Sequence, residues 1–324
     1  MNKDIFYVGI DVGSQELWTS IEGTKPKMFS HSKKGITSLY DWSVKKSNQS
    51  QVRFCMEATG VYSMSVANLL VEKHQAQLSI VNPAQIKTFA AMQMRRSKTD
   101  QIDAEIIRNF AETQSPRLWK PNSKQLQQLT ALVTQADAIK ESLGQWRNRH
   151  HAQGFIPGLP NEVKKAQRSI ERSLETQLEK IEMAIKNLCA QDSTLAHQVA
   201  LLCTIPGVAD QTAVKLLAYG QNWLTVKSAK ALTAHAGLAP KHHQSGTSVN
   251  RKARIDKRGN PKLRKTLFMP ALVAVQYNPD LKRFYQRLLE NGKPKKLALV
   301  AAMRKLLILS RAILISQKPF VPQN

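Results

Sequence analysis

The sequence contains few cysteines and no long apolar run, and each shortage excludes a class of protein. Its three cysteines, Cys55, Cys189 and Cys203, are an odd number without a C-x-x-C pair, which argues against a disulfide framework and against a zinc knuckle. No stretch approaches the roughly 20 uninterrupted apolar residues of a membrane span. The N-terminus also lacks a basic region followed by an apolar signal run. We therefore expect a folded cytoplasmic protein with no membrane partner.

Acidic residues are also scarce, most of all in the last third of the chain. The whole sequence has 48 Lys and Arg residues against 23 Asp and Glu residues, a net charge of +25. From Thr204 to the C-terminus there are 22 basic and only four acidic residues, so 18 of the 25 charges lie there. Such segregation predicts that this part of the chain binds a nucleic acid. The densest run supplies the residues that we expect to contact it: Arg251, Lys252, Arg254, Lys257, Arg258, Lys262, Arg264 and Lys265.

Apolar strands alternate with helical patterns between Ile5 and about Arg117. The strand signals are "IFYVGID", "LWTSIEG", "KPKMFSHS", "QVRFCMEA" and "QLSIVNP". A helical pattern follows the third, the fourth and the fifth, and we expect the last of these helices, after Pro83, to be long. This order, β-β-β-α-β-α-β-α, is that of the ribonuclease-H-like fold, which nucleases share with actin-like ATPases. We therefore predict an α/β N-terminal domain whose fold alone leaves both activities open.

The remainder of the chain reads as helical. From about Gln125 to Gln191 the pattern is broken only at "GFIPGLP", residues 154–160, whose prolines and glycines predict a turn or hinge. The second arm carries an apolar stripe that fits an antiparallel helical hairpin or an intermolecular coiled coil. Further on, residues 201–220 read as helix, tight turn and helix, with Ala209 where such hairpins usually have a second glycine. The apolar stripe of the second arm, which precedes residues 201–220, consists of Ile170, Leu174, Leu178, Ile181, Ile185 and Leu188.

Four acids stand where a metal-dependent nuclease needs them. Asp11 ends the first strand and Glu57 ends the fourth, while Asp100 and Asp103 lie three residues apart on one face of a predicted helix. Like charges so close repel unless a cation lies between them, and Mg²⁺ prefers oxygen ligands. An ATPase would instead need a second Asp-Gly hairpin and a glycine-rich adenosine motif, and the 14 glycines form no such cluster. The residues therefore favour a Mg²⁺-dependent nuclease site.

Seven blocks of the sequence resemble one family in order and spacing. They are "YVGIDVGSQ", "CMEATGVY", "VNPAQIKTFA", "RSKTDQIDAEII", "IPGVADQTAVKLLAY", "AGLAPKHHQSGTS" and "NGKPKKLALVAAMRKL". The chain thereby resembles the transposases of the insertion-sequence-110 family and the related pilin-gene DNA invertase. The resemblance implies a RuvC-like catalytic domain over residues 1–118, a helical coiled-coil region over 119–200 and a mainly helical transposase domain over 201–324. It also implies that Asp11, Glu57, Asp100 and Asp103 form the family's Asp-Glu-Asp-Asp tetrad.

The same resemblance implies a serine nucleophile and a set of partners. The family's Ser-Gly-x-Ser element maps onto Ser245, which would attack DNA to form a phosphoserine bond with Mg²⁺ at the tetrad; Ser248 is the local rival. The expected partners are donor and target DNA, a structured bridge RNA as guide and further copies of the chain in a dimer or tetramer. The expected location is the bacterial cytoplasm, at the nucleoid when the protein acts. A DNA invertase without a guide and a hydrolytic Holliday-junction nuclease remain the alternatives.

Overall fold

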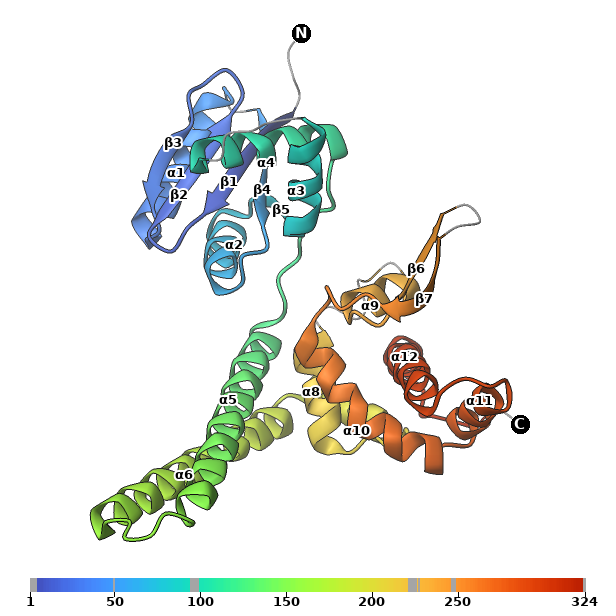
Figure 1. Ribbon diagram of the computed structural model, residues 1–324. Helices are drawn as coiled ribbons and strands as arrows, with labels where there is room; N and C mark the ends of the chain where they lie inside the picture. The colour runs from blue at the N-terminus through green and yellow to red at the C-terminus, as the bar shows by residue number, and fades with distance from the viewer. Residues whose placement is uncertain are drawn as a thin grey trace. The chain divides into compact units, whose positions relative to one another are not determined.

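The computed structural model describes residues 5–48, 50–93, 99–220, 226, 228–245 and 249–322, with the backbone alone at 241–245 and 249–253. Contacts within the chain divide it into two units, and the boundary in the sequence lies between Pro121 and Asn122. Each unit has its own apolar core. The two units are therefore described separately (Figure 1).

The first unit is built around one mixed sheet in the order β3-β2-β1-β4-β5. Strands β1, β2 and β3 are antiparallel neighbours, whereas β4 and β5 run parallel to β1. The element order is the one that the sequence predicts. The helix after Pro83, which we expected to be long, has only 10 residues and ends at Met92. The elements are β1 (Ile5–Val12), β2 (Glu16–Ile21), β3 (Lys27–Ser30), α1 (Lys33–Lys46), β4 (Gln51–Glu57), α2 (Val61–His74), β5 (Gln77–Val81), α3 (Pro83–Met92) and α4 (Asp100–Gln114).

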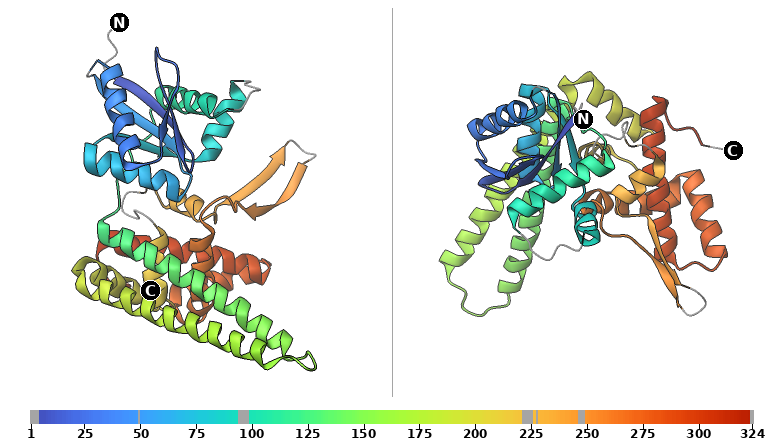
Figure 2. Two further views of the ribbon diagram at one scale, coloured as in Figure 1. Left: turned by 90° about the vertical axis from the view of Figure 1, so that its left-hand side faces the viewer. Right: turned by 90° about the horizontal axis from the view of Figure 1, so that it is seen from above.

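Helices cover both faces of this sheet (Figures 1 and 2). On one face, Val8 and Ile10 of β1 pack with apolar residues of α1 and α2. On the other face, Cys55 of β4 packs with residues of α3 and α4, including Ile107. Successive side chains of a strand point to opposite faces, so this division assigns every residue of β1 and β4 to one layer or the other.

Three helices begin with the same Asn-Pro pair. Asn82, Asn260 and Asn278 each accept a hydrogen bond from a backbone N–H in the first turn of the following helix. Proline suits the next position because it has no N–H to leave unpaired and its φ is already helical. These dipeptides therefore set the starts of α3, α10 and α11 from local sequence alone.

The second unit begins with the long helices α5 (Lys124–Gln153) and α6 (Asn161–Gln191), which pack against each other as an antiparallel hairpin. Ion pairs from Lys140 to Glu182 at 2.6 Å and from Arg147 to Glu175 at 2.7 Å follow the antiparallel register. The predicted break at residues 154–160 is confirmed, with Gly158 at a φ of 73°. All six residues of the α6 stripe remain half-buried.

The remaining elements form a helical body with one protruding strand hairpin (Figure 1). Its core joins apolar residues of α5, α7, α8, α10 and α12. Gly207, in the turn between α7 and α8, has a φ of 102°, and an added Cβ would lie 2.9 Å from the Pro270 carbonyl oxygen. The glycine thus serves close packing of that turn on α10 as well as its left-handed backbone. The elements are α7 (Ser193–Cys203), α8 (Asp210–Gly220), α9 (Ala229–His235), β6 (Pro240–Ser245), β7 (Val249–Ile255), α10 (Pro261–Tyr277), α11 (Pro279–Glu290) and α12 (Lys295–Ser316).

A polar cluster joins the helical hairpin to this body. Asp137 of α5 accepts hydrogen bonds from Tyr219 at 2.7 Å and from Lys215 at 2.5 Å, both on α8. Burial on its own would raise the pKa of the Asp137 carboxyl, but the bonds from Lys215 and Tyr219 and the charge of Lys140 outweigh it and lower the pKa. The ionised carboxylate therefore stabilises the contact between α5 and α8.

None of the described helices combines the length and the apolar character needed to cross a bilayer.

We predict that Asp137→Asn lowers the free energy of unfolding by about 1 to 2 kcal/mol at neutral pH, because it removes two charge-assisted hydrogen bonds. A carboxyl whose folded pKa is lowered contributes stability above its ordinary pKa and loses it as the pH falls through the folded value. The difference between the unfolding temperatures of wild type and variant should therefore shrink below about pH 4. A difference that is constant with pH would contradict this assignment.

Candidate active site

Gly9 of β1 brings helix α4 against the sheet. A Cβ added at Gly9 would collide with the backbone of α4, at the Ala104 carbonyl oxygen and the Arg108 N–H, and would lie 2.9 Å from the Arg108 Cα. Glycine inside a strand often marks such a close approach of backbone to backbone. Gly9 was not among the predicted site residues, although a glycine within the apolar run "IFYVGID" was the available signal.

Helix α4 runs antiparallel to β1. The Tyr7 hydroxyl lies 3.2 Å from the Ser115 hydroxyl, just past the end of α4, whereas Gly9 meets Ala104 and Arg108 nearer its start. The first turn of α4 is therefore the part that extends toward the carboxyl end of β1. This is the end at which Asp11 stands.

The strand register places Asp11 and Glu57 on the face of the sheet that α4 covers. Ile10 pairs with Met56 between the parallel strands β1 and β4, so Asp11 and Glu57 are the next residues of the two strands. They stand about 5 Å apart at the backbone and point to the same face. Burial raises the pKa of the Cys55 thiol on that face to about 12, and the negative charge of Glu57 adds to this effect.

Asp100 and Asp103 both lie in the first turn of α4, as predicted. Thr99 caps this helix by accepting the Ile102 N–H at 3.3 Å, and acids in a first turn also favour the helix dipole. Asp103 is half-buried on the side of the helix that meets the sheet, and Asp100 is exposed one turn earlier on the same stripe. The four predicted acids thus share one face and one end of the sheet. Among the residues that the structure describes, however, no three His, Cys, Asp or Glu side chains form a group that could hold a metal ion.

His31 links the turn that follows Asp11 to helix α2, which comes after Glu57 in the chain. Its Nδ1 donates to the Gly13 carbonyl oxygen at 2.8 Å, and its Nε2 lies 2.6 Å from the Ser65 hydroxyl of α2. The imidazole therefore joins the turn after β1 to the second turn of α2. Sequence reasoning missed this histidine because both partners are distant in the chain.

The predicted nucleophile belongs to the other unit. Ser245 is the last residue of β6 and pairs with Val249 across the strand hairpin. Its side chain and those of Arg251 and Lys252 lie outside the described part of the structure, as does the whole of Ser248. How these groups stand relative to the four acids thus remains a prediction.

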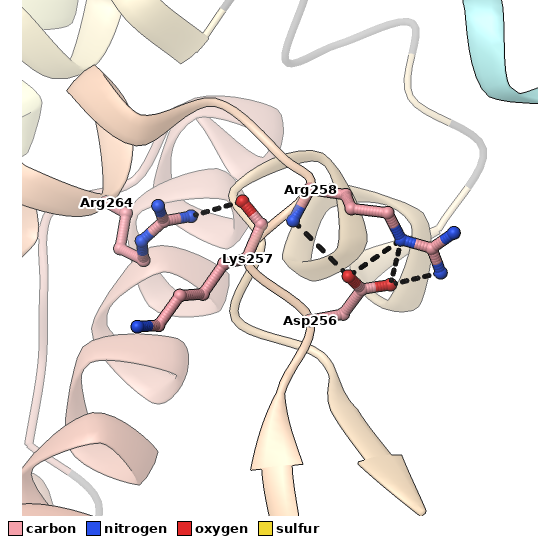
Figure 3. Close-up of polar contacts among 4 residues, drawn as sticks. All are labelled: Asp256, Lys257, Arg258 and Arg264. Carbon is pink, nitrogen blue, oxygen red and sulfur yellow. Dashed lines mark hydrogen bonds and ion pairs between the residues drawn. The ribbon is translucent and has the colours of Figure 1, made fainter.

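Two of the predicted nucleic-acid ligands also hold the base of this hairpin (Figure 3). The Arg258 guanidinium donates to both carboxylate oxygens of Asp256, at 2.8 Å for the shortest contact. Arg264 donates to the carbonyl oxygens of Ala236 at 3.1 Å and Lys257 at 3.4 Å. These bonds fix the segment that joins β7 to α10. Four further predicted ligands, Arg254, Lys257, Lys262 and Lys265, are exposed.

Comparison with known proteins assigns the chain to a family. Residues 8–153, which contain the four acids, match a transposase domain of the IS110 type named for Asp-Glu-Asp-Asp. Residues 199–286, which contain Ser245, match the transposase family IS116/IS110/IS902. Pilin gene-inverting proteins of Moraxella bovis and Moraxella lacunata are 33% and 32% identical over 97% of this chain and 97% of their own length. The chain belongs to the IS110 family of transposases and DNA invertases.

The IS110 relationship extends to a transposase of an insertion sequence. The transposase of IS1328 from Yersinia enterocolitica is 27% identical over 62% of this chain and 64% of its own length. The resemblance inferred from the seven sequence blocks is thereby confirmed. Divalent metal use agrees with the match to an Asp-Glu-Asp-Asp transposase domain.

We predict that Gly9→Ala displaces the first turn of α4, because the added methyl group meets helix backbone that cannot rotate away. Overpacking of this kind costs about 1 to 3 kcal/mol of stability. The variant should also cleave DNA much more slowly than its stability loss explains, measured well below its unfolding temperature.

Gly144→Ala is the matched control for this prediction. Gly144 lies within α5, and a Cβ there has no neighbour within 4 Å among the described atoms. The control should keep wild-type cleavage and gain about 0.5 to 1 kcal/mol of helix stability. Equal cleavage by Gly9→Ala and Gly144→Ala would show that the contact between β1 and α4 does not position the acids.

Proposed function

We propose that this protein cuts and rejoins DNA strands through a covalent bond between Ser245 and a DNA phosphate, with Mg²⁺ held by Asp11, Glu57, Asp100 and Asp103. The observation that carries the proposal is the placement of these acids on one face and at one end of the sheet, within the segment that matches a DNA transposase domain. Carboxylate oxygens are the ligands that Mg²⁺ prefers.

The chain's own residues have separate tasks in this proposal. Asp11 and Glu57 lie on two neighbouring strands and Asp103 in the first turn of α4, so the three would supply carboxylate ligands from one end of the sheet. When bound, Mg²⁺ would stabilise the negative charge that develops at the phosphate and ease deprotonation of the nucleophile. His31 joins the turn after Asp11 to helix α2.

The covalent step conserves the energy of the phosphodiester bond. The Ser245 oxygen forms a bond to phosphorus while the bond from phosphorus to one deoxyribose oxygen breaks. The proton lost by the serine is taken up, overall, by the oxygen that leaves. A hydroxyl group of another strand can then attack the phosphoserine and release Ser245. One phosphate ester replaces another in each step, so strand exchange needs no ATP.

We also propose the finer architecture that goes with this activity. The sheet order β3-β2-β1-β4-β5, with β1 beside β4, supports a ribonuclease-H-like fold for residues 1–118. The half-buried stripe of α6 supports a coiled-coil region at 119–200 that contacts another copy of the chain in a dimer or tetramer. Residues 201–324 then form the transposase domain, which includes Ser245 and the strand hairpin of β6 and β7.

Two modes of action share this chemistry. In the first, a structured bridge RNA pairs with donor and target DNA. The basic residues between Arg251 and Lys265 hold RNA and DNA, while base pairing selects the sequence. In the second, the protein inverts a DNA segment without a guide, and the match over nearly full length to pilin gene-inverting proteins favours this candidate. RNA that copurifies with the protein and is required for recombination would decide for the first mode.

We predict that the wild-type protein becomes covalently attached to a pre-nicked DNA substrate in the presence of Mg²⁺ and that Ser245→Ala abolishes this adduct. Denaturing gel electrophoresis of labelled DNA measures the attachment. Ser248→Ala is the matched control, because it removes a hydroxyl three residues away and should leave the adduct intact.

Two outcomes would contradict the proposed serine chemistry. If wild type and Ser245→Ala both cut DNA and neither becomes attached, the protein is a hydrolytic nuclease. If Ser248→Ala abolishes the adduct and Ser245→Ala retains it, the nucleophile is Ser248.

A further inference from the structure

Helices α11 and α12 carry a second concentration of cations, separate in sequence from the strand hairpin. We define the α11–α12 basic surface by six exposed residues: Lys282, Arg287, Lys293, Lys295, Lys296 and Lys305. The same stretch has two acids, Asp280 and Glu290, and Asp280 is bound by Arg283 at 2.7 Å. Within the described part of the chain, we find no ion pair between these six cations and an acid.

Two of these cations, from different helices, meet at one aromatic ring. The Lys305 ammonium of α12 lies 4.8 Å from the centre of the Phe284 ring, and the Arg287 guanidinium of α11 lies 5.7 Å from it. The ring attracts each cation but does not neutralise either charge. Both cations therefore keep their positive charge where α11 and α12 meet, and both can attract a polyanion.

The lysines at the start of α12 oppose the stability of that helix. Lys295 and Lys296 occupy its first turn, which contains no acid, and its Pro294 cap makes no side-chain hydrogen bond. The helix dipole favours negative charge at this end, so cations there are unfavourable for folding. Helix stability therefore does not account for these lysines.

We propose that the α11–α12 basic surface binds the phosphate backbone of a nucleic acid, in addition to the β6–β7 hairpin. This inference rests on the proposed function, in which the protein handles DNA. Most of the six residues are lysines, which attract phosphate as point charges, so the contact is independent of base sequence. Figure 1 shows the strand hairpin extending from the helical body while α11 lies beside α12, so one transposase domain offers two distinct basic elements. Recombination requires more than one DNA segment to be held, and a second surface meets that need.

The test replaces Lys293, Lys295 and Lys296 together by Gln in the full-length protein. Binding of a labelled 30-base-pair DNA duplex of random sequence is measured over a range of salt concentrations. The slope of log affinity against log salt is negative, and each lost phosphate contact reduces its magnitude by about 0.9. Loss of three lysine contacts should therefore make the slope shallower by about 2 to 3. A structured RNA of similar length, measured in parallel, shows which nucleic acid loses more affinity.

Lys25→Gln/Lys33→Gln/Lys34→Gln is the matched control. These three lysines of the first unit are exposed, and their replacement changes the net charge equally. The control should keep the wild-type slope. A second variant, Arg287→Gln/Lys305→Gln, tests the pair around Phe284 and should also flatten the slope.

The outcomes separate this inference from the proposed function. If Arg254→Gln/Lys257→Gln at the strand hairpin flattens the slope and both α11–α12 variants keep it, the inference is wrong and nucleic-acid binding stands. If no variant at either surface changes binding to DNA or RNA, nucleic-acid binding by both surfaces is wrong. If the α11–α12 variants lose affinity for vesicles of anionic phospholipid but not for DNA or RNA, the surface binds membranes and the inference is overturned.

Discussion

The approach of the α4 backbone to Gly9 is the contact on which the candidate active site depends. It holds α4 flat against β1 and antiparallel to it, so the first turn of the helix lies toward the carboxyl end of the strand. Asp100 and Asp103 thereby come to the same end of the sheet as Asp11 and Glu57. No side chain mediates the contact, which leaves little room for adjustment and fixes the position of α4 on the sheet.

The large positive charge is divided between structural and exposed groups. Several arginines hold particular partners: Arg147 binds Glu175, Arg258 binds Asp256, and Arg264 binds two backbone carbonyl groups. The planar guanidinium suits such multiple hydrogen bonds. The lysines of α11 and α12, by contrast, extend into solvent. A fold that satisfies many of its arginines internally still presents a strongly positive surface to a polyanion.

Much of the architecture could be predicted because its signals are local. The apolar strands and the break at residues 154–160 each depend on signals within a few residues, and the structure confirms both predictions. The shared face of Asp100 and Asp103 follows from helix geometry alone. A glycine within an apolar strand signals a close approach at Gly9 but not its partner, and the link made by His31 and the binding of Asp137 to α8 leave no local signal. Each depends on which distant segments meet, and the tertiary packing decides that.

Anomalous X-ray scattering from crystals grown with Mn²⁺ in place of Mg²⁺ would locate the metal ion itself. We predict a peak at the carboxyl end of β1 and β4, within coordination distance of Asp11 and Glu57 and facing the first turn of α4. We also predict that the peak disappears in crystals of Asp11→Asn. A peak elsewhere in the molecule, or one that persists without the Asp11 carboxylate, would contradict the assignment of these acids as the metal site.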